Sequence, residues 1–302
     1  MINVLYFDDG DIALSDSNIE KVQKHLDPGF YSVETTETMF SISAKLKSYE
    51  VKIPKSARSF AQDIVDFDYF RRLFSPESEQ LHRDMGINCK VGCLFYGKQG
   101  SGKTTTIQAV AELLIEEYGS VVFVVEDYNG YKACRKFIKQ LRKNRDFITV
   151  ILWDECEDAF RGAETELKPM LDGTKAIDRS VLLCSTNYID KIPDTIKDRP
   201  SRFKYVIDIS SIKEPDIVFS ILQNMNKTLT DPLTDQQLRD LVSICTDKTV
   251  DEIKNAFTDA CFQRIGVERV KDPVIKKPEV SIDMKFPSGG FHDYIRRSLG
   301  GS

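Results

Sequence analysis

The sequence predicts an α/β fold: a parallel sheet flanked by helices, with a small α/β unit before it and a helical lobe after it. Short apolar runs rich in β-branched residues alternate with stretches whose apolar residues recur every three or four positions, as in buried parallel strands joined by helices. From Glu214 onward the patterns are helical only. The predicted divisions are 1–55 for the small unit, 56–212 for the sheet, 213–268 for the lobe and 269–302 for a flexible tail.

The first 55 residues combine strand patterns with one short helix. The strands are predicted over residues 2–7, 30–34, 39–46 and 49–53. Asp16 or Ser17 can cap a helix that runs to His25. A unit this small has little core of its own, so we expect it to dock on the sheet that follows and to recruit a partner or substrate.

The central sheet and the lobe follow in order. Residues 57–88 are predicted to be helical. The sheet strands are predicted over residues 91–96, 121–126, 148–153, 181–185 and 205–209. Helices are predicted over 104–118, where Gly119 supplies the C-terminal cap, and in the lobe over 214–226, 234–246 and 249–264. Functional residues are expected at the carboxyl ends of the strands, as in other parallel α/β sheets.

A glycine-rich turn joins the first sheet strand to the helix over 104–118. It runs from Gly97 to Thr104 and fits G-x-x-x-x-G-K-[ST], the phosphate-binding loop, which predicts a P-loop NTPase. Glycines let backbone N–H groups surround phosphate oxygens, and the helix N-terminus adds its positive dipole end. The residues expected to bind the nucleotide are Gly97, Gln99, Gly100, Ser101, Gly102, Lys103, Thr104 and Thr105. Ile64 and Val65 are candidates for contacting the base, or else core residues.

Two further motifs follow strands of the same sheet. The strand over 148–153 ends in Asp154 and Glu155, about 50 residues after the loop, which is the usual spacing of its catalytic partner. Asp154 and Thr104 would hold Mg²⁺, and Glu155 would deprotonate the attacking water. The alternative role for an acidic pair at a strand end is a helix cap. Asn187, after the next strand, can either approach that water and the γ-phosphate or cap the following turn.

These motifs, followed by Arg199-Pro200-Ser201-Arg202-Phe203, resemble the AAA clade of AAA+ ATPases over about residues 60–265. The resemblance implies ATP as the nucleotide and Mg²⁺ as its metal. It also implies that Arg199 and Arg202 contact the γ-phosphate held by a neighbouring subunit, so that the chain forms a homo-oligomeric ring, usually a hexamer. Thr249-Val250-Asp251 stands where the clade has Gly-Ala-Asp, and no arginine is there to be carried over as a lid arginine.

The lead-in over residues 85–97 is similar to that of the branch containing the mitochondrial Rieske-protein translocase. That branch has a membrane anchor, whereas no apolar run in this sequence approaches the length of a membrane span. We therefore carry over the ATPase module and not the membrane task, and expect a cytoplasmic protein. The seven scattered cysteines are expected to be reduced core residues, and no metal site is predicted beyond that of Mg²⁺.

The sequence leaves two hypotheses for the molecule on which the ATPase acts. Tyr128-Asn129-Gly130 resembles the aromatic-x-Gly pore loop of protein-threading rings, although a plain turn fits equally well. The net charge of −5 and the absence of a recognisable DNA-binding motif favour remodelling or threading of a protein partner. The alternative is a nucleic-acid-associated ATPase, such as a loader or translocase. It draws on a basic stripe, which is either a solvated helix face or a track for a nucleic-acid backbone: Lys132, Arg135, Lys136, Lys139, Arg142 and Lys143.

Overall fold

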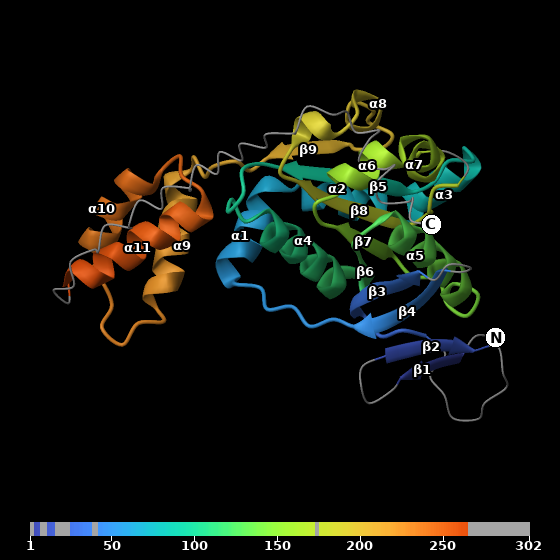
Figure 1. Ribbon diagram of the computed structural model, residues 1–302, viewed down its shortest axis with the longest axis horizontal. Helices are drawn as coiled ribbons and strands as arrows, with labels where there is room; N and C mark the ends of the chain where they lie inside the picture. The colour runs from blue at the N-terminus through green and yellow to red at the C-terminus, as the bar shows by residue number, and fades with distance from the viewer. Residues whose placement is uncertain (1–2, 7–10, 16–24, 38–41, 173–174, 265–302) are drawn as a thin grey trace, which may run out of the picture. The chain divides into compact units, whose positions relative to one another are not determined.

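The computed structural model describes residues 3–6, 11–15, 25–37, 42–172 and 175–264 (Figure 1). Their strands form one nine-stranded sheet in the order β1-β2-β4-β3-β6-β7-β8-β5-β9. The strands are β1 (Asn3–Tyr6), β2 (Asp11–Ser15), β3 (Gly29–Glu37), β4 (Ile42–Ser48), β5 (Lys90–Tyr96), β6 (Val121–Val125), β7 (Thr149–Trp153), β8 (Ser180–Thr186) and β9 (Tyr205–Asp208). The predicted α/β fold is confirmed.

Five of these strands form the parallel half of the sheet, and each lies where the sequence predicts it to within two residues. β6, β7, β8, β5 and β9 are joined by parallel pairing throughout. β7 and β8 are buried along their whole length. Because parallel strands of this kind are covered on both faces, their sequences are nearly continuous apolar runs.

The N-terminal strands extend this same sheet, so they are not a separate α/β unit. β3 pairs in parallel with β6, and β4 and β2 continue the sheet by antiparallel pairing. Tyr31 and Val33 of β3 are buried, and the pairing covers the backbone edge that β6 would otherwise leave open. The strand predicted over 49–53 is wrong, and β2 was not predicted. The helix predicted to run to His25 lies largely outside the described residues.

Helices cover both faces of the sheet (Figure 1). One face packs against α1 (Lys55–Ile64), α2 (Phe67–Leu73) and α4 (Lys103–Tyr118), and the other against α5 (Tyr128–Leu141), α6 (Glu157–Gly162) and α7 (Glu164–Leu171). The sheet residues alternate accordingly, with Phe123 and Ile151 in one core and Val122 and Val150 in the other. The remaining short helices are α3 (Pro76–Asp84), η1 (Ile189–Lys191) and α8 (Asp194–Lys197).

The lobe contains α9 (Pro215–Asn226), α10 (Asp235–Cys245) and α11 (Val250–Arg264), all within about one residue of their predicted bounds. They enclose a third core, built around Val218, Leu222 and Leu238. Thr234 and Gln237 form a capping box at the start of α10. Among the described residues, no helix is long and apolar enough to span a membrane. The predicted tail lies outside those residues.

Candidate nucleotide-binding site

The glycine-rich turn between β5 and α4 has a backbone conformation that requires glycine at two positions. Gly100 and Gly102 have φ angles of +80° and +90°, which side-chain-bearing residues rarely adopt. A Cβ atom on Gly100 would lie 2.7 Å from Oδ2 of Asp251, and one on Gly102 would lie 3.1 Å from Cγ2 of Val250. The backbone N–H of Asp251 also donates to the carbonyl of Gly100, at 3.1 Å. The turn is therefore held against the start of α11.

Lys103 begins α4 and is only 6% exposed. Its Nζ donates to the carbonyl oxygens of Gly97 (3.0 Å) and Lys98 (2.8 Å). Burial lowers the pKa of this amine, and the charges of Asp154, Glu155 and Glu157 oppose that shift. The Oγ of Ser101 is buried and has no partner in the described part of the chain. An ammonium group and an unpartnered hydroxyl on a turn at a helix N-terminus fit a phosphate chain.

The two predicted metal-binding side chains lie together. The hydroxyl of Thr104 donates to Oδ2 of Asp154 at 2.5 Å. The other carboxylate oxygen of Asp154 accepts from the hydroxyl of Ser185 on β8 and from the backbone N–H of Glu155 (3.2 Å). A carboxylate and a hydroxyl beside a phosphate-binding turn are the oxygen ligands that Mg²⁺ prefers. Sequence analysis did not assign Ser185 the role of fixing Asp154.

Glu155 and Asn187 are also brought together, across the carboxyl ends of β7 and β8. The amide Nδ2 of Asn187 donates to Oε1 of Glu155 at 3.0 Å. Glu155 has a φ angle of +49°, a strained conformation for a residue other than glycine and one that recurs at functional sites. Neither capping alternative is observed: α6 has no side-chain cap bond, and Thr186 Oγ1 accepts the N–H of Tyr188. The pair can hold and deprotonate a water molecule.

An apolar cavity of about 180 Å³ lies beside the phosphate-binding turn. It is lined by residues of α1, α4 and the lobe: Pro54, Ser56, Ala57, Phe60, Gly102, Thr105, Thr106, Ile212, Ile221, Met225, Val250 and Lys254. Its position and apolar lining suit a nucleotide base. Sequence analysis missed this set, because it comes from three segments that no local motif connects.

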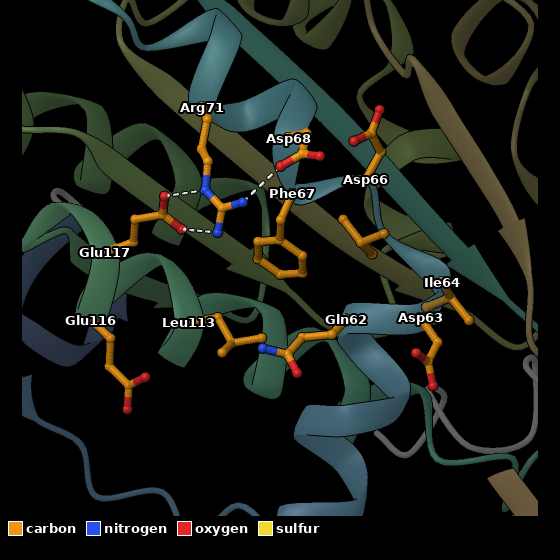
Figure 2. Close-up of a pocket in the computed structure, with 11 residues that line it drawn as sticks. Gln62, Asp63, Ile64, Asp66, Phe67, Asp68, Arg71, Leu113, Glu116 and Glu117 are labelled. Atoms are coloured by element: carbon orange, nitrogen blue, oxygen red, sulfur yellow. Dashed lines mark hydrogen bonds and ion pairs between the residues drawn. The ribbon is translucent and has the colours of Figure 1, made fainter. Parts of the chain in front are cut away.

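Ile64 and Val65 do not line this cavity. Val65 is 3% exposed, and both residues belong to the core under α1 and α2, so the core alternative is correct for them. They also border a different cavity of about 740 Å³, near the end of α4 (Figure 2). Arg71 lines that cavity and donates hydrogen bonds to Glu117 (2.6 Å) and Asp68 (2.7 Å).

The two predicted arginines differ in their surroundings. The side chain of Arg202 is 4% exposed, and its Nε donates to Oδ2 of Asp172 at 2.9 Å. Its Nη1 also donates to the carbonyl of Thr195. Arg199 contacts the same carboxylate through Nη1 at 3.2 Å, yet its side chain is 62% exposed. In this conformation only Arg199 offers its guanidinium group to a neighbouring molecule.

Tyr128 and Gly130, the predicted pore-loop residues, lie in the first turn of α5 and not in a loop. Asp127 caps this helix by accepting from the N–H of Gly130 at 2.6 Å. A Cβ on Gly130 would lie 3.3 Å from that carboxylate, which is a tight contact. Tyr128 is partly buried against the core. The pore assignment therefore remains a prediction.

The basic stripe on α5 divides into two groups. Arg142 is tied to the fold, because it donates to the carbonyl oxygens of Phe147, Asp178 and Arg179. Arg135 donates to the carbonyl of Lys175. The exposed remainder of the stripe consists of Lys132, Lys136, Lys139 and Lys143.

Comparison with known proteins agrees with this geometry. Residues 93–211 match the family described as "ATPase family associated with various cellular activities (AAA)". The chain is 31% identical over 121 residues to the probable replication factor C subunit 5 of Dictyostelium discoideum, covering 37% of this chain and 34% of that protein. It is 27% identical over 132 residues to replication factor C subunit 3 of Oryza sativa subsp. japonica, covering 40% and 36%.

A longer match joins the chain to the cell division control protein 48 homolog B of Arabidopsis thaliana. Identity is 25% over 207 residues, which is 58% of this chain and 34% of that protein. In each of these three comparisons, the chain spans about a third of the relative's length.

Proposed function

We infer that this chain, which belongs to the AAA family of ATPases through residues 93–211, hydrolyses ATP with Mg²⁺ in order to act on nucleic acid. The hydrolysis part of the proposal rests on one observation: the Asn187–Glu155 contact and the Thr104–Asp154 contact lie at the same end of the sheet as the phosphate-binding turn. Metal ligands, a general base and a phosphate cradle are the parts that ATP hydrolysis needs.

In this proposal each residue has a defined task. Lys103 leaves the carbonyl oxygens of its own turn and binds the β- and γ-phosphates. Thr104 and Asp154 hold Mg²⁺, which neutralises phosphate charge when bound. Glu155 accepts a proton from the attacking water, and the amide of Asn187 orients both the carboxylate and the water.

We further propose that the site is completed by a neighbouring subunit. Arg199 is exposed and held near the end of α8 by Asp172, so it can reach a nucleotide bound by another copy or by a homologous subunit. The relatives from Dictyostelium and Oryza are themselves named as subunits. The buried Arg202 then positions Asp172, and through it Arg199, in place of contacting phosphate directly. A hexameric homo-oligomer remains the expectation from the resemblance.

We propose nucleic acid as the molecule on which this ATPase acts, because of the names of two similar proteins. Both replication factor C subunits are named for replication, which is work on nucleic acid. Remodelling of a protein partner, the hypothesis favoured by Tyr128-Asn129-Gly130, has lost part of its support, since that tripeptide begins a helix. It stays as the second candidate.

The test is ATP hydrolysis by the full chain with increasing DNA or RNA. We expect stimulation at about 50 mM salt that weakens steeply by about 200 mM, because phosphate contacts release counterions. Wild-type hydrolysis that no DNA or RNA changes, and no binding of either polymer at low salt, would overturn the nucleic-acid part. Hydrolysis itself would still stand.

A further inference from the structure

One exposed face of α5 carries a row of positive charge. Lys132, Lys136 and Lys139 lie on the helix and Lys143 lies in the turn after it, and all four are exposed. We call these four residues the α5 lysine face. Their spacings of four, three and four residues place them on one line along the helix. At 1.5 Å of rise per residue, the row is about 16 Å long.

The charges of this face have no carboxylate partner among the described residues. The helix α5 itself contains no Asp or Glu. Lys132 lies over the ring of Tyr128, with its Nζ 5.2 Å from the ring centroid. By contrast, Arg135 and Arg142 on the same helix bind backbone carbonyl groups. Intramolecular partners therefore take up the arginines and leave the lysines available.

A groove runs along this face, between α5 and β4. Its cavity is about 250 Å³, and its lining combines amide, ammonium and apolar groups: Ala44, Asn129, Lys132, Ala133, Lys136, Phe137 and Gln140. The exposed Gln140 can offer side-chain N–H donors, and the half-buried ring of Phe137 supplies an apolar wall. Positive charge beside an aromatic side chain is the combination that binds single-stranded nucleic acids.

We propose that the α5 lysine face binds the phosphate backbone of a nucleic-acid strand, and that the groove beside it receives a sugar or base. This inference rests on the proposed function, for which it names the binding surface. Lysine acts as a point charge for phosphate, and a row of lysines tracks a backbone without reading its sequence.

An acidic protein is the other polymer that such a row could attract. Stable protein interfaces have an apolar core surrounded by a polar rim. The exposed positions of α5 are three lysines and one glutamine, and the helix contributes no exposed large apolar side chain. The face therefore fits a polyanion with regularly spaced charges better than it fits a folded acidic protein.

The test is binding of a fluorescent 20-nucleotide DNA strand to the full chain, measured by anisotropy at several salt concentrations. The variant replaces Lys132, Lys136 and Lys139 by Gln. We expect the slope of log affinity against log salt to fall by about 2, at about 0.7 per lost phosphate contact on a single strand. The matched control replaces Lys52, Lys213 and Lys227, which are equally exposed but lie outside α5, and its slope is expected to stay at the wild-type value.

The outcomes separate the two proposals. If wild type binds the strand and the α5 variant keeps its slope, the surface assignment is wrong while the proposed function survives. If wild type binds no DNA or RNA at low salt and neither polymer changes its hydrolysis, both proposals fail. Polyglutamate is the competitor, added at the same charge concentration as the strand. If it displaces the strand from wild type, and the α5 variant loses as much affinity for polyglutamate as for the strand, the face binds acidic polymers in general. That result would overturn the nucleic-acid assignment. Unchanged basal ATP hydrolysis shows that the variant is folded.

Discussion

The α5 lysine face and the sheet edge that carries the candidate nucleotide-binding site hold their functional groups in opposite ways. We call the second region the nucleotide edge; it includes Lys103, Thr104, Asp154, Glu155 and Asn187. At the nucleotide edge, Thr104 is bonded to Asp154 and Asn187 to Glu155, and Lys103 is bonded to backbone carbonyls. On the α5 lysine face, the described structure gives the charges no carboxylate partner. Catalysis depends on the precise placement of each catalytic group, so removing one group can abolish it. Binding to a nucleic-acid backbone is the sum of small, similar contributions from separate phosphate contacts. Single substitutions should therefore have large effects in one region and graded effects in the other.

The largest single effect is expected from Arg199→Ala. If Arg199 completes a neighbour's site, its loss should lower the maximal rate of ATP hydrolysis by about 1,000-fold, the lower end of the range for an arginine supplied in trans. Mixing this variant with Lys103→Ala should restore part of the rate, since the two defects fall on opposite sides of one interface. Lys197→Ala, two residues away at the end of α8, is the control. A wild-type rate for Arg199→Ala would remove this residue from the site.

Lys103→Ala should come next. Loss of a charge-assisted phosphate contact costs about 3 kcal/mol at most, so affinity for ATP should fall by up to about 150-fold. Titration with a fluorescent ATP analogue measures this directly. Lys98→Ala changes an exposed lysine of the same turn and should leave the affinity within about twofold. Equal affinities for the two variants would contradict the role given to Lys103.

Asp172→Ala should act mainly on stability, because it leaves the guanidinium group of Arg202 buried without its partner. Breaking a buried pair in this way costs about 3 kcal/mol. Denaturant unfolding monitored at Trp153 measures it. Asp158→Ala, which removes an exposed pair with Arg161, should cost less than about 1 kcal/mol. Comparable losses for Asp172→Ala and Asp158→Ala would show that Arg202 does not depend on Asp172.

The same pair predicts a pH dependence. Burial raises the pKa of Asp172, but hydrogen bonding and the charge of Arg202, with help from Ser201 and Arg199, outweigh it and leave the pKa lowered. A carboxyl with a lowered folded pKa stabilises the fold above its unfolded pKa of about 4, and this contribution is lost as pH falls through the folded value. The stability gap between wild type and Asp172→Ala should therefore be constant from pH 5 to pH 8 and shrink only in acid. A gap that shrinks near pH 7 would point to a different group.

The smallest effect is expected from a single lysine of the α5 face. Lys136→Gln should reduce the salt slope of single-strand binding by about 0.7 and leave basal hydrolysis unchanged. Anisotropy titration of the labelled strand at three salt concentrations resolves this. A complete loss of binding from this one change would mean that the face works by position, like the nucleotide edge, and the contrast between the two regions would be wrong.

Much of the nucleotide edge could be predicted because it is encoded locally. The phosphate-binding turn, the acidic pair and Asn187 each follow a recognisable strand, and strands that end at one edge bring their next residues together. What could not be predicted depends on contacts distant in the chain. The base cavity joins Pro54 to Val250, and the buried state of Arg202 depends on Asp172.

The N-terminal region shows the same limit. Its strand patterns were mostly correct, but no local signal reveals that β3 pairs in parallel with β6 and so joins the central sheet. The aromatic-x-Gly tripeptide illustrates the opposite case, and its role as a pore loop remains a prediction. The local pattern is present, but Asp127 accepts a hydrogen bond from the N–H of Gly130 and so caps the start of α5.

The measurement that tests the account most directly compares Glu155→Gln with wild type at saturating Mg-ATP. The substitution keeps the shape of the side chain and its contact with Asn187 but removes the base. We predict unchanged affinity for ATP and phosphate release at least about 100-fold slower, which is the contribution of a positioned general base. Phosphate release by Glu155→Gln within a few fold of the wild-type rate would contradict the assignment of this edge of the sheet as an ATP-hydrolysing site.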